Sequence, residues 1–230
     1  TGGTEGGAGI GDGINGSGGT VAISNSFVMA GSISDTGSQS SWNGLIFEGE
    51  VGKVYGESFT ISTDCTIPEG KTLVVAADQT ISITETATFT NAGTIYNSGT
   101  FIGTVANSGT IHNAGSISGA SGGTIKHYSI SIEQTETSCQ TATLTLKVND
   151  TAFEETVTYS LNEAEANAVI ENGNTLKVAD SGVGTPIPVT ATFTVNDVSM
   201  TRTESVTITS RHVYDSNGFC TICNGYQPAT

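Results

Sequence analysis

The sequence predicts an all-β protein in which a parallel β-solenoid is followed by a two-sheet β-sandwich. Three observations lead to this fold class. Thr, Ser, Val and Ile are abundant and long helix-forming runs are missing, and β-branched side chains favour the extended chain. Apolar residues recur every six residues between Ser58 and Ile117, and from Ser129 they alternate with polar ones. A six-residue period fits neither a helix nor a hairpin, whereas a period of two indicates half-buried strands.

Composition and charge limit what the chain can do. Its 230 residues suit two domains of roughly 100 residues each. The formal net charge of -15 repels phosphate backbones and anionic lipids, so we expect neither nucleic acid nor a membrane surface as a partner. No apolar run is long enough to span a bilayer and no signal-peptide pattern is present, so we expect no membrane insertion. The expected segments are a Gly-rich stretch at 1–20, a solenoid at 21–127, a sandwich at 128–210 and a Cys-x-x-Cys tail at 211–230.

The predicted solenoid contains an internal repeat. Four motifs of Asn-x-Gly followed by Thr or Ser are separated by six, ten and six residues, and they begin at Asn91, Asn97, Asn107 and Asn113. A hexad of extended residues and a corner can wind into a coil, and stacked coils pair equivalent strands. Gly and Asn suit the corners because both tolerate left-handed backbone conformations. We therefore expect stacked Asn and Thr ladders, and a corner role for the asparagines is favoured over ligand binding.

The handedness of the coil does not follow from the period. Six-residue coils suit a left-handed triangular helix, whereas the ten-residue step and the looser region from Ser24 to Gly56 favour a right-handed one. We expect a right-handed β-helix.

Longer alternating strands follow the solenoid. They are expected at 129–134, 141–149, 154–161, 167–171, 174–179, 188–196 and 205–210. Turn residues such as Asn172-Gly173 separate them. About seven strands in roughly eighty residues is what an immunoglobulin-like sandwich needs, so the sequence predicts that fold for 128–210.

Three parts of the chain resemble segments of bacterial surface proteins. The segments at 7–23, 66–75 and 90–101 look like the β-solenoid repeats of large surface proteins of gut-dwelling Firmicutes. The stretch at 156–195 has a Tyr-Ser strand, an Ala-x-Val before Asn-Gly and a closing Val-Thr-Ala-Thr, and it resembles bacterial Ig-like domains of the group-2 type. The tail at 212–229 resembles a short His-Cys-x-x-Cys module of the same proteins. These resemblances imply a modular, secreted or cell-surface protein with a role in adhesion or glycan contact.

The expected function is non-enzymatic: adhesion, glycan contact or structural display, with glycans or host surface proteins as partners. The alternative is a polysaccharide lyase or hydrolase, because many β-helices act on polysaccharides. Such chemistry needs clustered carboxylates or a basic residue beside them. The acidic residues between Ser58 and Lys126 are few: Asp64, Glu69, Asp78 and Glu85. We therefore expect no catalytic residues.

One candidate glycan-binding pair lies near the start of the predicted solenoid. An exposed Trp42, the single tryptophan of the chain, beside Tyr55 would make a platform for stacking a sugar. Apolar residues flank Trp42, however, and they favour its burial in the core.

The candidate metal site lies in the tail. A two-residue spacer lets the sulfurs of Cys220 and Cys223 grip one zinc ion, and the imidazole of His212 supplies a third ligand. A fourth ligand has to come from Cys139, another chain or further residues downstream. A Cys220–Cys223 disulfide or free thiols is the competing interpretation. The missing fourth ligand favours the disulfide or free thiols, so we expect no cofactor, with zinc in this tail as the alternative.

Overall fold

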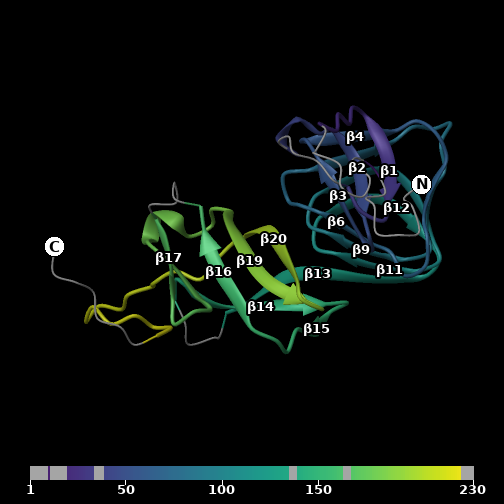
Figure 1. Ribbon diagram of the computed structural model, residues 1–230. Coiled ribbons are helices and arrows are strands. Elements are labelled where there is room, and N and C mark those ends of the chain that lie inside the picture. Colours follow the sequence, from purple (N-terminus) through teal and green to yellow (C-terminus); the bar gives the residue numbers. More distant parts are fainter. Residues whose placement is uncertain (1–9, 11–19, 34–38, 135–138, 163–166, 224–230) are drawn as a thin grey trace. The chain divides into compact units, whose positions relative to one another are not determined.

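The computed structural model describes Ile10 and residues 20–33, 39–134, 139–162 and 167–223. The chain divides into two compact units, Thr1–Lys126 and His127–Thr230 (Figure 1). Strand β13 (Thr124–Glu133) contains the boundary between them. The Gly-rich stretch at 1–20 lies almost wholly outside the described residues, and within it Ile10 forms a parallel bridge with Ile33.

The first unit is a parallel β-solenoid of about five turns, as the repeat predicts. Its strands stack in three columns: β3, β6, β9 and β11; then β4, β7, β10 and β12; then β5, β8 and the second half of β10. At the first end β1 pairs with β2 in parallel and β2 pairs with β3 antiparallel. The bounds are β1 (Ser26–Ala30), β2 (Gly44–Glu48), β3 (Val51–Tyr55), β4 (Ser58–Ile61), β5 (Cys65–Ile67), β6 (Thr72–Val75), β7 (Thr80–Ile83), β8 (Phe89–Asn91), β9 (Thr94–Asn97), β10 (Thr100–Asn107), β11 (Thr110–Asn113) and β12 (Ser116–Ser121). A short 3-10 turn, η1, covers Gln39–Ser41.

The six-residue rhythm is the step from one strand to the next along a coil, whereas the coil itself is longer. In the most regular part the sheet register pairs Ile95 with Ile111 and Phe101 with Ile117, which are sixteen residues apart. One six-residue step and one ten-residue step together make this coil. Thr94 lies between Thr72 and Thr110 in one column, so the predicted threonine ladder is present. The right-handed winding stays a prediction.

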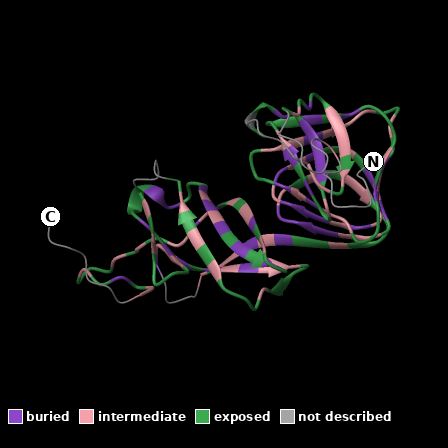
Figure 2. Cartoon of the chain, in the orientation of Figure 1, coloured by how far each residue is buried: buried purple, intermediate pink, exposed green. Residues whose placement is uncertain are grey.

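Apolar side chains from every column fill one continuous interior. Figure 2 marks buried positions along the strands of this unit. In strands such as β4 and β6 the apolar side chains occupy alternate positions, so that one face of the strand points inward, whereas β2, β9 and β11 are buried over most of their length. The buried residues of this core are Leu45, Phe47, Val54, Phe59, Ile61, Ile67, Leu73, Val75, Ile81, Phe89, Ile95, Phe101, Val105 and Ile111. The solenoid is therefore a packed core and not a channel.

Two asparagine ladders close the corners of the coils. The Nδ2 atom of Asn91 donates to Oδ1 of Asn107 at 2.8 Å, and Nδ2 of Asn97 donates to Oδ1 of Asn113 at 2.7 Å. All four side chains are buried. The predicted ladder and the corner role are confirmed, because these amides bond to each other and to backbone carbonyls of the turns. The predicted left-handed backbone at these corners is wrong, since neither these asparagines nor the glycines of the same motifs have a positive φ.

Replacing Asn107 with alanine is expected to lower the free energy of unfolding by about 2–4 kcal/mol. Its side chain accepts from Asn91 and donates to the carbonyl of Gly122 at 3.0 Å, so its loss breaks the ladder bond and the bond to the next corner and leaves a small cavity. Urea unfolding measures the change. The matched control is Asn43→Ala, whose side chain is exposed and whose loss should cost less than about 0.5 kcal/mol. Equal stabilities of the two variants would contradict the ladder's role.

An aromatic stack on β9 and β11 accompanies the ladder of Asn97 and Asn113. Tyr96 and His112 are register partners on β9 and β11, and their rings are stacked with centroids 4.8 Å apart and an interplanar angle of 12°. His112 is only 4% exposed. Desolvation, with a smaller contribution from the positive charge of Lys126, lowers the pKa of His112 to about 4. The imidazole is thus a packing residue that stays neutral in the folded protein at neutral pH.

We expect the stability of the solenoid to decrease below pH 6.5 in a way that depends on His112. The unfolded chain binds a proton at this side chain near pH 6.5 and the folded chain only near pH 4, so the contribution of neutral His112 is complete above pH 6.5 and is lost between these values. The loss is on the order of 2 kcal/mol. Urea unfolding at pH 7 and pH 5 should show a smaller difference for His112→Gln than for the native chain. An equal difference for the variant and the native chain would contradict this role of His112.

The second unit contains two antiparallel sheets. One has the order β13, β14, β18, β17 with β15 beside β14, and the other has the order β16, β19, β20. Aromatic side chains of this unit meet in its core, where Phe193 of β19 lies 4.8 Å from Tyr128 of β13 and 5.3 Å from Phe153, centroid to centroid. The bounds are β14 (Thr141–Val148), β15 (Thr151–Ala152), β16 (Val157–Leu161), β17 (Ala168–Glu171), β18 (Thr175–Val178), β19 (Ile187–Val195) and β20 (Val198–Val206), with a 3-10 turn, η2, at Asp180–Gly182.

One predicted strand of this unit is wrong. The sequence predicts a strand at 205–210, but β20 begins at Val198 and ends at Val206. Asn196 and Asp197 have φ angles of 48° and 65°, which form a tight hairpin turn directly after β19. The Asn-Asp pair is the turn signal that the prediction missed.

The described ranges contain no helix that is long and apolar enough to cross a membrane.

Candidate metal centre

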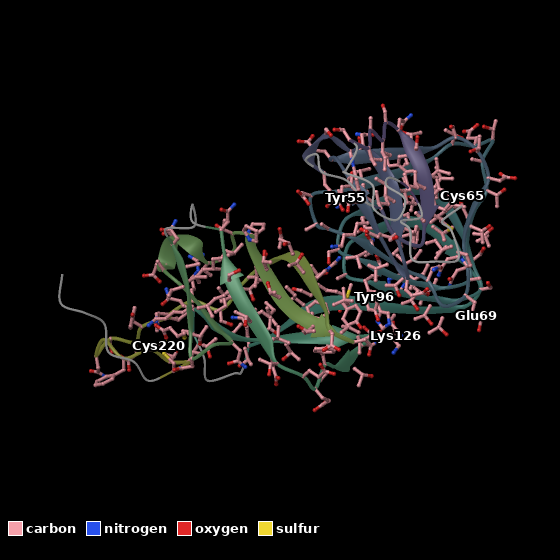
Figure 3. All side chains as sticks on the ribbon, in the orientation of Figure 1. Tyr55, Cys65, Glu69, Tyr96, Lys126 and Cys220 are labelled. Carbon is pink, nitrogen blue, oxygen red and sulfur yellow. The ribbon has the colours of Figure 1, made fainter. Side chains whose placement is uncertain are left out.

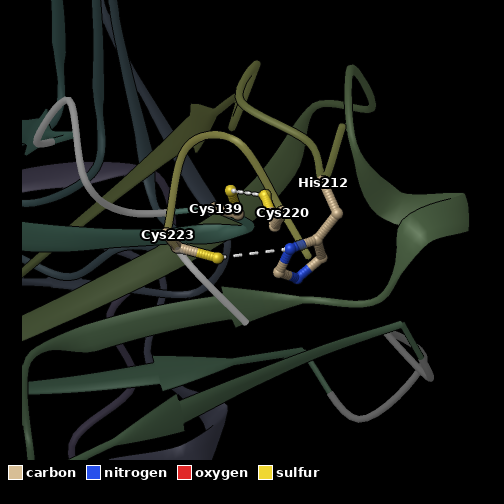
Figure 4. Close-up of side chains that lie close together, drawn as sticks. All are labelled: Cys139, His212, Cys220 and Cys223. Atoms are coloured by element: carbon tan, nitrogen blue, oxygen red, sulfur yellow. Dashed lines mark hydrogen bonds between the residues drawn. The ribbon is translucent and has the colours of Figure 1, made fainter. Parts of the chain in front are cut away.

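The structure brings the three predicted tail ligands together and adds a fourth. His212, Cys220 and Cys223 meet Cys139, and the four ligand atoms lie within 4.8 Å of one another (Figure 4). Cys139 and Cys220 are buried, and His212 and Cys223 are half-buried. All four residues belong to the second unit.

A tight hairpin positions Cys220. The backbone N–H of Asp215 donates to the carbonyl of Phe219 at 2.8 Å, and Tyr214 pairs with Cys220 in an antiparallel bridge. The carboxylate of Asp215 accepts from the N–H groups of Asn217 and Phe219, and Gly218 takes the left-handed conformation (φ 79°) that the turn requires. These hydrogen bonds, led by the one from Phe219, lower the pKa of Asp215. The Asp-Ser-Asn-Gly sequence therefore builds the loop that presents Cys220.

A separate backbone contact brings Cys139 to this hairpin. Gln140, the residue after Cys139, donates its N–H to the carbonyl of Ser210 at 2.9 Å, and its own carbonyl accepts from Val178 at 2.8 Å. Gln140 has a φ of 60°, which turns the chain into β14. Because Ser210 is two residues before His212, this hydrogen bond holds the start of β14 beside the start of the tail.

The distances suit one small tetrahedral ion. Sγ of Cys139 lies 3.4 Å from Sγ of Cys220, and Sγ of Cys223 lies 3.4 Å from Nδ1 of His212. A zinc ion with its usual bonds to sulfur and nitrogen would separate its ligand atoms by about 3.5–3.8 Å. Small side-chain movements would therefore place one ion at bonding distance from all four atoms.

The backbone favours a thiolate at Cys220. Burial by itself acts to raise the pKa of Cys220, but hydrogen bonds from the backbone N–H groups of Cys223 and Ile222, and one from the side chain of His212, outweigh it and lower the pKa. The N–H of Ile222 lies 3.4 Å from the Cys220 sulfur. Desolvation, followed by the neighbouring sulfur atoms, raises the pKa of Cys139. These hydrogen bonds thus favour the thiolate form of Cys220, which is the form that binds a metal.

No protein-family model, curated protein or solved structure matches this chain. The interpretation of the cluster therefore depends on its own geometry. Four protein ligands leave no open position for water or a substrate, which is the pattern of a structural metal site and not of a catalytic one. All four cysteines are free in the structure, so it contains no Cys220–Cys223 disulfide.

The other candidate residues lie in the first unit. Trp42 is 2% exposed, and its Nε1 donates to the carbonyl of Val21 at 2.9 Å, so it is a core residue as its apolar neighbours predict. The Tyr55 ring packs against it with centroids 5.2 Å apart. Glycan binding at this pair stays a prediction, to which the buried indole adds no support. Cys65, labelled with Tyr55 in Figure 3, is outside the cluster, and desolvation together with Asp64 raises its pKa to about 11.

Proposed function

We propose that this chain is a non-enzymatic module of a secreted or cell-surface protein. In this proposal the solenoid is a stiff stalk or display surface and the second unit is an immunoglobulin-like spacer. The main observation in its favour is that the asparagines and apolar residues of the repeat are buried, the former in ladders and the latter in the core. A repeat whose recurring residues stack the coils on one another is better suited to provide length and rigidity than to catalyse a reaction.

The resemblance to surface proteins of gut-dwelling Firmicutes agrees with this role. Glycans or host surface proteins are the proposed partners, since the net charge of -15 disfavours anionic polymers and lipids. Adhesion would then depend on the outward-facing residues of the coils. The group-2 Ig-like assignment of residues 128–210 is part of the same proposal and is compatible with two antiparallel sheets.

The alternative is an enzyme of the β-helix type, but the groove described for the solenoid contains a single acidic residue. A groove between the β1 end and the β4–β5 corner is lined by residues 25–27 and 59–65, among which Asp64 is the single acidic residue. The carboxylate of Asp64 accepts the N–H of Thr88 at 2.7 Å, so it serves the turn between coils. Acid–base cleavage of a glycoside uses two carboxyl groups that flank the bond.

A binding screen of the whole chain tests the display function. Mucin glycans, plant polysaccharides and matrix proteins are presented on a surface, and saturable binding to one class is the expected result. A Tyr55→Ala variant then tests the predicted sugar platform, with Tyr159→Ala in the second unit as its control. Release of new reducing ends or unsaturated sugars from any polysaccharide, lost on Asp64→Asn, would show an enzyme and refute the proposal.

A further inference from the structure

We propose that Cys139, His212, Cys220 and Cys223 bind one Zn²⁺ ion in a closed tetrahedral site. The ion would fasten the C-terminal hairpin of residues 213–221 to the start of β14. This inference adds a metal centre to the chain and does not depend on the display function proposed above.

The first argument is the convergence of ligands from distant parts of the chain. Cys139 precedes Cys220 by 81 residues, yet their sulfur atoms are 3.4 Å apart and both side chains are buried. Burying two thiols in contact, with a third thiol and an imidazole within 4.8 Å, gathers the residue types that metals bind. The one cysteine outside the second unit, Cys65, has no place in this cluster.

The second argument is that the surroundings orient the ligands. The hairpin hydrogen bonds hold Cys220, and the N–H of Ile222 points at its sulfur, as second-shell donors do at thiolate ligands. The ring of His212 is stacked on that of Tyr214 with an interplanar angle of 15°, which restricts the imidazole. Nδ1 of His212 faces Cys223 and is the nitrogen that the geometry assigns to the ion.

The third argument concerns the identity of the metal. Three sulfur ligands and one nitrogen in a tetrahedron select zinc among the common divalent ions, whereas calcium and magnesium prefer six or more oxygen atoms. A Cys139–Cys220 disulfide is the chemical competitor, because their sulfurs are neighbours. Such a bond would remove two of the four ligands, so zinc binding and this disulfide exclude each other.

Metal analysis of the full chain is the direct experiment. The protein is purified in reductant without chelator, and we expect about one zinc per chain by mass spectrometry of the metal content. X-ray absorption at the zinc edge should report three sulfur ligands near 2.3 Å and one nitrogen near 2.0 Å, both about the usual bond lengths. Cobalt added to the metal-free protein should give the intense visible bands of a tetrahedral thiolate site.

Single substitutions test the ligand set. Cys139→Ser should weaken zinc binding by more than about 100-fold, since loss of even second-shell partners costs 10–100-fold. Cys65→Ser is the matched control, and it should retain full stoichiometry and affinity. If Cys139→Ser folds poorly, the absorption spectrum of the native chain still counts its sulfur ligands.

Three results would overturn the inference. The first is reduced, folded protein that takes up no zinc or cobalt. The second is an absorption spectrum dominated by oxygen or with fewer than three sulfurs, and the third is unchanged affinity in Cys139→Ser. Peptide mapping that finds a Cys139–Cys220 disulfide in protein purified with reductant would establish the competing state. None of these results bears on whether the solenoid binds glycans, so the two proposals fail separately.

Discussion

Gly109→Ala is expected to destabilise the solenoid by at least about 3 kcal/mol. This is the upper end of the usual cost of overpacking, because the added atom would contact rigid backbone. A Cβ atom on Gly109 would lie 2.0 Å from the carbonyl oxygen of Gly93 and 2.8 Å from the backbone of Ala92 on the neighbouring coil. No side-chain rotation relieves that overlap, because the atoms it meets are backbone. The coils have to separate, and the hydrogen bond from Thr110 N–H to the Gly93 carbonyl, 3.0 Å long, is then lost.

The matched control is Gly31→Ala in the same unit. A Cβ atom there meets nothing within 4 Å, so the substitution should change the free energy of unfolding by less than about 0.5 kcal/mol. The fluorescence of Trp42, the single tryptophan, reports unfolding of the solenoid in urea. Gly115→Ala meets the carbonyl of Gly99 at the same 2.0 Å and should behave as Gly109→Ala does. Native-like stability of both variants would mean that the coils are not stacked as closely as described.

Removing the proposed zinc is expected to destabilise the second unit. A ligand that binds only the folded state stabilises it by about 4 kcal/mol when its free concentration is about 1,000-fold above Kd. For a unit of this size such a loss lowers the midpoint of thermal unfolding by roughly 15–30 °C. The hairpin of residues 213–221 should open first, because the ion joins it to Cys139, whereas the Gln140–Ser210 hydrogen bond lies before the hairpin begins.

Hydrogen exchange resolves this effect by position. After treatment with a strong chelator, amides of the hairpin and of the first residues of β14 should exchange faster, and added zinc should restore their protection. The Trp42 transition serves as an internal control, because the tryptophan lies in the first unit and the cluster in the second. If the chelator leaves the hairpin protected in protein shown to contain zinc, the ion is bound at another place.

The sequence predicts the corners of the solenoid but not the length of its coils. The Asn-x-Gly motifs predict corners and ladders because they recur in step with the strands, but the structure gives another reason for their glycines. These glycines have no positive φ, and a Cβ atom on them would lie within 2.3 Å of a carbonyl oxygen of the neighbouring coil. The length of a coil is not local, since it depends on which strand lies above which. Asn91 bonds to Asn107 and not to Asn97, six residues away, so motifs alternate between two corners of the same coil.

The second unit shows the same division. Alternation of apolar and polar residues predicts most of its strands, including the Asn172-Gly173 hairpin between β17 and β18, whose residues have φ angles of 52° and 82°. The predicted strand at 205–210 is wrong, because Asn196 and Asp197 form the hairpin turn and the last strand begins directly after them. The structure shows β19 and β20 paired over their whole length from Val195 to Ile187.

The sequence by itself determined the all-β class, the repeated corners and three residues of the Cys–His cluster, since each depends on neighbours within a few residues. Only the tertiary structure decided the sixteen-residue coil and the position of Cys139. The physical reason is the same in each case. Contacts between residues far apart in the chain are selected by the packing of whole strands, and a linear pattern does not record that packing.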